Sequence, residues 1–203
     1  MGDIISSGKS DPIILQEEFS KLIGKVNNEF KKRIKSPLTI TLGDEFQGVI
    51  DDLNTSIEII VSIEEQKWDL DYPIYLRYSL GFGEISTPLN QKIAHGMLGP
   101  GLTEVREALT NLKKDDERIV ILGKIDQRET ISIVLSLFLE KHGEWAWKDK
   151  EIISGYLKGK NYNQVASILH RDSSSMWRKF KSLGFDSYEK RKRLIKLMTE
   201  NDH

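Results

Sequence analysis

Two neighbouring carboxylates give residues 43–45 the most distinctive chemistry in the sequence, because Gly43 is followed directly by Asp44 and Glu45. Acids held side by side on a rigid bend can bind a divalent cation and, through it, phosphate groups. The same residues also suit a solvated turn in which the Asp44 side chain bonds its own backbone. Whether these acids form a metal site or a simple turn depends on the elements that position them.

A β-hairpin is predicted to position these acids. Leu38, Ile40 and Leu42 alternate with threonines, a period of two that is typical of a half-buried strand, and residues 46–50 are apolar enough to form the returning strand. Gly43 would lie at the tip, where a tight hairpin requires a positive φ that glycine adopts without strain. The acids would then be fixed at the ends of two strands.

Hydrophobic periodicity predicts the other elements of the N-terminal part. Helices are expected over residues 13–34, 51–66 and 102–112, and strands over 74–85 and 118–122. Pro37 is expected to end the first helix, and a very short apolar strand at the N-terminus carries Asp3. This order of elements predicts an α+β fold of the ferredoxin-like or palm kind, with a mainly antiparallel sheet and helices on one face.

One face of the strand over 74–85 carries unusually small residues, namely Ser79, Gly81 and Gly83. Small residues in a strand indicate that another group approaches the backbone closely, although a bend in the chain is the alternative. The sequence therefore predicts either a group packed against this face near the end of the strand or a bend in the chain there.

Residues 129–203 are expected to form an all-α helix-turn-helix domain that follows a first domain at residues 1–125. Helices over 163–169 and 173–183, joined by a short turn, give this pattern, with the small Ala166 where they cross. Polar residues of the second helix would face a DNA groove, and a basic helix over 186–198 would contact phosphates. The predicted DNA-binding residues are Ser173, Ser174, Ser175, Arg178, Lys179, Lys181, Lys190 and Arg191. An αα-hairpin with a solvated face remains the alternative.

Composition and charge narrow the function classes. The 203 residues include no cysteine, which excludes disulfides and thiol catalysis. Residues 1–128 hold 16 Lys and Arg against 21 Asp and Glu, whereas residues 129–203 hold 14 against 10. A basic excess confined to the C-terminal part predicts a polyanion partner there, with a merely solvated basic helix as the alternative. Without a long apolar run or an export leader, a cytoplasmic location and no membrane partner are expected.

The sequence resembles the SatD family in four motifs, which are GDIISS at residues 2–7, TITLGDEFQG at 39–48, LRYSLGFGEI at 76–85 and GMLGPG at 96–101. The likeness covers nearly the whole chain, including the C-terminal helices. It implies common ancestry and says little about mechanism.

A more distant likeness connects the N-terminal motifs to the palm domain of class III nucleotide cyclases and GGDEF-type diguanylate cyclases. In those enzymes two acids hold a pair of metal ions over a nucleotide triphosphate, and Asp3 and Asp44 match these positions, with Glu45 matching the Glu of GGDEF. The resemblance thus implies a metal site at Asp3, Asp44 and Glu45 that takes Mg²⁺ or Mn²⁺ with a nucleotide. The nucleotide-binding residues that it implies are Ser6, Ser7, Gly43 and Arg106.

The sequence also departs from the cyclase pattern. Leu42 stands where GGDEF has its first glycine, Thr39 and Ile40 stand where adenylyl cyclases have a base-recognising lysine, and Arg106 is one position out of step. Phosphate and metal binding could survive these changes while cyclisation is lost.

Three hypotheses follow from the sequence. The first is a DNA-binding regulator whose palm-like domain senses a nucleotide. The second is a metal-dependent nucleotidyl cyclase or nucleotidyltransferase that uses Asp3 and Asp44. The third is a degenerate palm that serves only to form a homodimer.

Overall fold

The computed structural model describes residues 1–9, 11–114 and 117–200. Its strands are β1 (Gly2–Ile4), β2 (Ile34–Ile40), β3 (Glu45–Ile50), β4 (Leu76–Gly81) and β5 (Ile119–Leu122). Its α-helices are α1 (Pro12–Glu29), α2 (Leu53–Gln66), α3 (Pro100–Leu112), α4 (Arg128–Glu144), α5 (Lys150–Leu157), α6 (Tyr162–Ile168), α7 (Ser173–Leu183) and α8 (Phe185–Glu200). Short 3₁₀ helices lie at η1 (Ser7–Lys9), η2 (Lys67–Asp69) and η3 (Trp147–Asp149).

The strands form one five-stranded sheet in the order β2-β3-β1-β4-β5. The central strand β1 pairs antiparallel with both β3 and β4, β2 pairs antiparallel with β3, and β5 pairs parallel with β4. The predicted α+β class is therefore confirmed as a mixed sheet with many helices. β1 holds its central place although it is only three residues long.

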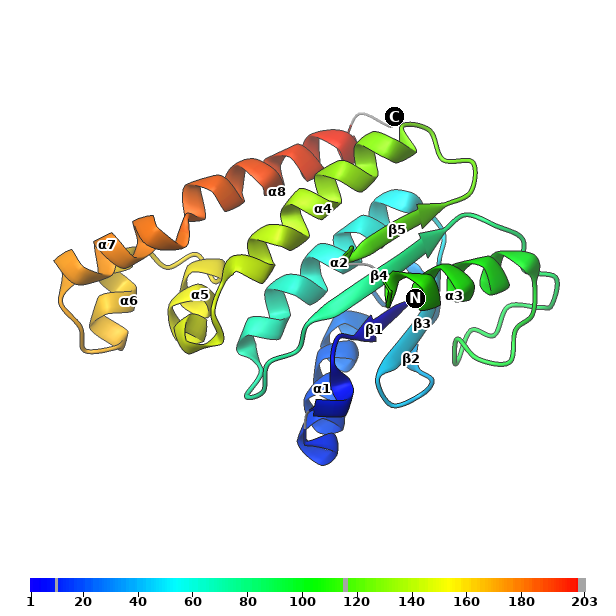
Figure 1. Ribbon diagram of the computed structural model, residues 1–203, viewed down its shortest axis with the longest axis horizontal. Helices are drawn as coiled ribbons and strands as arrows, with labels where there is room; N and C mark the ends of the chain where they lie inside the picture. The colour runs from blue at the N-terminus through cyan, green and yellow to red at the C-terminus, as the bar shows by residue number, and fades with distance from the viewer. Residues whose placement is uncertain (10, 115–116, 201–203) are drawn as a thin grey trace.

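Helices cover both faces of the sheet, which corrects the expectation that they lie on one face. In Figure 1, α1 and α2 lie behind the strands and α3 lies in front of them. The two faces of β4 show the same arrangement, because Tyr78 points towards α2 whereas Gly81 lies against α3. A Cβ atom at Gly81 would come within 2.3 Å of Val105 Cγ2. The predicted close approach to this face is confirmed, and the approaching group is α3.

The first helix ends earlier than predicted, at Glu29, and Pro37 lies inside β2 instead of before it. Proline lacks the N–H that a central strand would need, but β2 is an edge strand. The pairing of β2 with β3 also shifts register between Ser36 and Thr39, on either side of the proline. The sheet thus accommodates Pro37 because β2 is an edge strand and its hydrogen-bonded pairing with β3 is irregular there.

The helices of the C-terminal half pack onto the sheet through α4. This helix contacts β5 and runs beside α8, and α5 lies against η2 (Figure 1). One hydrophobic cluster of the described residues extends from Ile4 in β1 to Ile195 in α8. The predicted domain boundary falls in the loop between β5 and α4, and the core continues across that loop; two separate domains stay a prediction. Among the helices described, none is long and apolar enough to span a bilayer.

Candidate functional site

Asp3 lies at the centre of a charged cluster on the α3 face of the sheet. Strand pairing sets Asp3 opposite Glu45 on one side and Arg77 on the other. Directly opposed residues of antiparallel strands point to the same face. Lys113, which follows α3, reaches the cluster from above: its Nζ lies 3.2 Å from Asp3 Oδ2 and 3.0 Å from Glu45 Oε1. Arg77 Nε lies 3.3 Å from Asp3 Oδ1.

Burial and opposite charges act against each other in this cluster. Asp3 is only 2% exposed. Burial raises the pKa of the Asp3 carboxyl above its usual value, and the attraction of Lys113 and Arg77 offsets this only in part. Partial burial opposes the charge of Lys113, but hydrogen bonds to Glu45 and Asp3 raise the pKa of its ammonium, which therefore stays charged at neutral pH.

In this arrangement the donor set does not suit a divalent ion. Within residues 1–9, 11–114 and 117–200, no three acidic or histidine side chains gather as a metal ion would need. Mg²⁺ and Mn²⁺ prefer several oxygen ligands, whereas Asp3 and Glu45 share the ammonium group of Lys113. The predicted metal site thus brings two of its three acids together around a lysine.

The third predicted ligand, Asp44, has a different partner. Ser7 Oγ donates to Asp44 Oδ2 at 2.7 Å, which joins a predicted nucleotide-binding residue to a predicted metal ligand. Gly43 has the expected positive φ of 83°, and Ser6 also lies in the left-handed region with a φ of 59°. The hairpin tip and the chain after β1 therefore meet through a serine and an aspartate.

Arg106, the remaining predicted nucleotide-binding residue, extends from α3 over the same face of the sheet. Its Nη2 donates to Gln47 Oε1 at 3.2 Å. Gln47 follows Glu45 on the same side of β3, so Arg106 and Lys113 form one basic edge of α3 above β1 and β3. Lys113 and Arg77 were not predicted from the sequence, although the place of Arg77 between apolar residues of a strand was a usable signal.

The helices α6 and α7 form a closely packed pair. Val165 and Ala166 of α6 and Met176 and Leu183 of α7 are buried. The chain between the helices turns at His170, which has a φ of 51°. Asp172 caps α7 by accepting from the backbone N–H of Ser175 at 2.7 Å.

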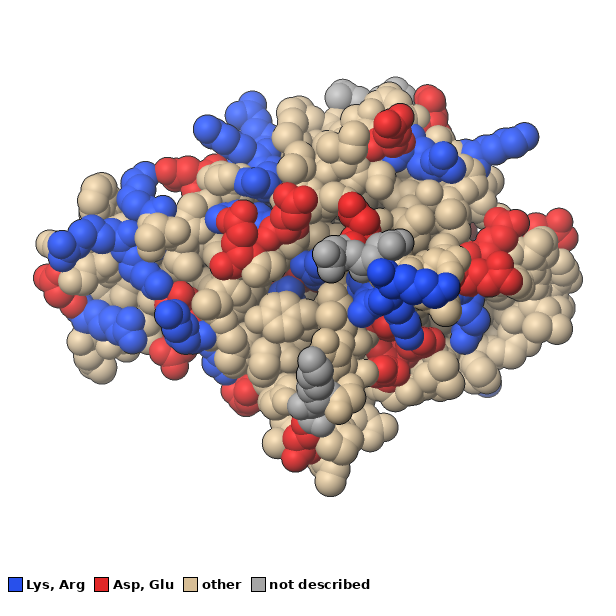
Figure 2. Space-filling model, in the orientation of Figure 1, with Lys and Arg blue, Asp and Glu red and all other residues tan. Residues whose placement is uncertain are grey.

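The predicted DNA-binding residues fall into two groups. Those on α7 are largely exposed, and Figure 2 shows several Lys and Arg side chains over the α5–α7 end of the molecule. Lys179 is paired with Asp149 at 2.8 Å and Lys181 with Asp186 at 2.7 Å. Arg178 donates to Ser175 Oγ at 3.5 Å, and its charge also acts on the Asp172 carboxyl.

The second group lies on α8, the helix that follows α7. Lys190 lines a groove between α2 and α8, and Arg191 donates to Ser187 within its own helix. These two residues are therefore placed along the helix that follows α7.

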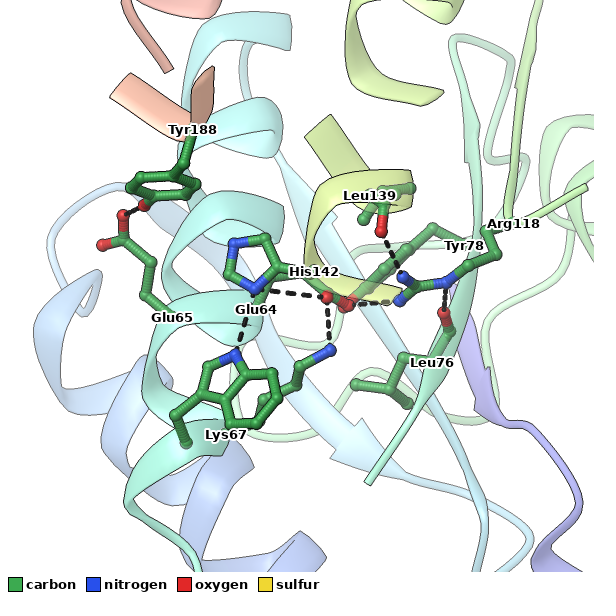
Figure 3. A network of polar contacts seen from close by, with 10 residues as sticks. Glu64, Glu65, Lys67, Leu76, Tyr78, Arg118, Leu139, His142 and Tyr188 are labelled. Atoms are coloured by element: carbon green, nitrogen blue, oxygen red, sulfur yellow. Dashed lines mark hydrogen bonds and ion pairs between the residues drawn. The ribbon is translucent and has the colours of Figure 1, made fainter. Parts of the chain in front are cut away.

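A buried polar network between α2, the sheet and α4 was not predicted from the sequence (Figure 3). Its centre is Glu64, which is fully buried and accepts from Lys67 at 2.5 Å, Tyr78 at 2.7 Å and Arg118 at 2.7 Å. Arg118 also donates to the carbonyl of Leu139 in α4 at 2.8 Å. These contacts join α2, β4 and α4.

His142 completes the network from α4. It accepts through Nδ1 from Trp68 Nε1 at 3.1 Å and lies 4.0 Å from Glu64 Oε2. Burial lowers the pKa of His142 well below its usual value, so the ring is neutral at pH 7. Burial alone would raise the pKa of Glu64, but Arg118 and Lys67 outweigh it and hold that pKa at about 2.

Fold and clusters define an α+β protein with a mixed sheet, a charged cluster on one sheet face and a paired-helix C-terminal part with an exposed basic helix. The chain belongs to the SatD family, whose family model matches residues 1–198. This confirms the resemblance seen in the sequence motifs. No curated protein and no solved structure matches the chain.

Proposed function

We propose that this SatD-family protein is a cytoplasmic DNA-binding regulator that binds duplex DNA through α7 and senses a nucleotide at the sheet. One observation carries the DNA-binding part. Ser174, Trp177, Arg178 and Lys181 form an exposed stripe along α7, on the side opposite the buried Met176. This is how the second helix of a helix-turn-helix presents side chains to a major groove.

The positive charges on this stripe can bind DNA phosphates without breaking strong ion pairs. Arg178 forms no salt bridge within 4 Å among the described residues, although its charge also acts on the Asp172 carboxyl. The Lys181–Asp186 pair is exposed, with 56% and 78% of the two side chains accessible. Exposed pairs contribute only about 0–1 kcal/mol and exchange readily for a phosphate. The stripe therefore offers two cations to a DNA backbone.

Fluorescence anisotropy of a labelled duplex with the full-length protein tests this proposal. We expect binding that weakens with salt at a log-log slope of about −0.9 per phosphate contact. Arg178→Ala should weaken binding and reduce the slope by about 1 if it contacts a phosphate. Lys32→Ala is the matched control, because Lys32 is also exposed but follows α1. No binding at low salt, or equal binding by both variants, would refute the proposal.

Connectivity supports a palm-like reading of the sheet. The first six strands and α-helices follow the order strand, helix, two strands, helix, strand, with β1 between β3 and β4, as in ferredoxin-like and palm folds. The nucleotide-sensing proposal draws support from the hydrogen bond between Ser7 and Asp44, two residues to which the cyclase likeness assigns nucleotide and metal binding. A nucleotide bound there at 100 times its dissociation constant should stabilise the protein by about 2.7 kcal/mol in thermal unfolding.

The pairing of Asp3 with Glu45 across β1 and β3 keeps a second candidate function, a nucleotidyl cyclase or nucleotidyltransferase, under consideration. Release of pyrophosphate from a nucleoside triphosphate with Mg²⁺ or Mn²⁺ would support it. Turnover that persists unchanged in Asp44→Ala would count against the assigned residues.

A further inference from the structure

Lys113 occupies the position between two carboxylates that a metal ion takes in metal-dependent sites. Its single ammonium group contacts Asp3 Oδ2 at 3.2 Å and Glu45 Oε1 at 3.0 Å. With Arg77 on the other oxygen of Asp3, two negative charges face two positive charges. The cluster is thus electrically balanced by side chains of the chain itself.

The same cluster retains a polar atom that a ligand could use. Asp3 Oδ1 is buried and has no hydrogen-bond partner among the described residues, because the Arg77 contact lacks hydrogen-bond geometry. Ser79 Oγ, two residues after Arg77 on the same face of β4, is also buried without a partner. Buried polar atoms are rarely left unpaired, so each one calls for an explanation such as a bound water or ion.

Lys113 is well placed to control that site. Its side chain is 40% exposed, so it can leave without unpacking a core, whereas Asp3 cannot move from the central strand. A lysine ammonium is a compact point charge on a flexible stem. As long as it remains, a divalent ion would have to approach a cation at van der Waals distance.

We propose that Lys113 is a resident cation that replaces a divalent metal at the Asp3–Glu45 pair, and that its removal converts the pair into a metal-binding site. The inference deepens the proposed nucleotide-sensing role of the sheet, because a phosphate ligand would then meet Lys113 and Arg77 without a metal. It is independent of DNA binding by α7, which is measured separately.

Mn²⁺ titration of the full-length protein, followed by the electron paramagnetic resonance signal of free Mn²⁺, tests the proposal. We expect Lys113→Met to bind one Mn²⁺ at least about ten-fold more tightly than the unsubstituted protein, since a positive charge leaves two carboxylates. Adding Asp3→Asn to this variant should abolish the gain. Lys114→Met is the matched control, because Lys114 contacts only Asn111 among the described residues and should bind Mn²⁺ like the unsubstituted chain.

Two results would contradict the proposal. Tight Mn²⁺ binding by the unsubstituted protein that is lost in Asp3→Asn would overturn the proposal and favour the enzyme alternative. So would a folded Lys113→Met protein with no gain in affinity. Should Lys113→Met not fold, Lys113→Gln is measured in its place, and Lys113→Arg must in either case behave like the unsubstituted protein.

Discussion

Glu64→Gln is expected to be among the most damaging single substitutions in this chain. The amide keeps the size of the side chain but removes the charge that Lys67 and Arg118 share. Glu64 and Lys67 are almost fully inaccessible, with 0% and 2% of their side chains exposed, so water cannot replace the lost charge. Removing one partner of a buried ion pair costs about 3–5 kcal/mol of unfolding free energy.

Urea denaturation monitored by tryptophan fluorescence measures this loss, because Trp68 lies beside the network. The control is Glu58→Gln, which breaks a pair with Arg33 whose side chains are 43% and 46% exposed. That surface pair should contribute about 1 kcal/mol or less. If the two variants lost equal stability, the buried network would not make the large contribution to the free energy of unfolding that its burial indicates.

The pH dependence of stability gives an independent check on the same residue. Glu64 has a pKa of about 2 in the fold against 4.5 in the unfolded chain, so the unfolded state binds its proton first as the pH falls. The stabilisation is therefore complete above pH 4.5 and is lost as the pH falls towards 2, by about 3 kcal/mol. Glu64→Gln should lack this part of the acid sensitivity. An unchanged acid profile in the variant would contradict the assignment.

Three further predictions use the same unfolding assay. Gly81→Ala places a methyl group 2.3 Å from Val105 and should cost about 1–3 kcal/mol, whereas Gly24→Ala, in open space on α1, should gain about 0.5–1 kcal/mol. Neutral His142 should make stability fall as the pH drops below 6.5, since only the unfolded chain then takes up the proton, and His142→Gln should flatten that region. Met176→Ala should cost about 2–5 kcal/mol because Met176 is 1% exposed.

Local patterns predicted the elements better than their packing. The alternation in residues 74–85 located β4, and Gly43 has the positive φ expected at a hairpin tip. The buried network could not be foreseen, because Glu64 and Arg118 are 54 residues apart and each looks like an ordinary surface charge in the sequence. Only the tertiary fold brings α2, β4 and α4 together with Arg118 around one carboxylate.

The side of the sheet taken by α3 explains why the charged cluster was only half predicted. Strands β3, β4 and β5 run in the same direction, and they follow their sequence order across the sheet. The connections through α2 and α3 would therefore lie on the same face of the sheet if both had the same handedness. They lie on opposite faces, and the two crossovers therefore differ in hand, although almost all such connections are right-handed. The common rule would leave Asp3 and Glu45 on an uncovered face. The exceptional crossover carries Arg106 and Lys113 over them, and Lys113 contacts both carboxylates.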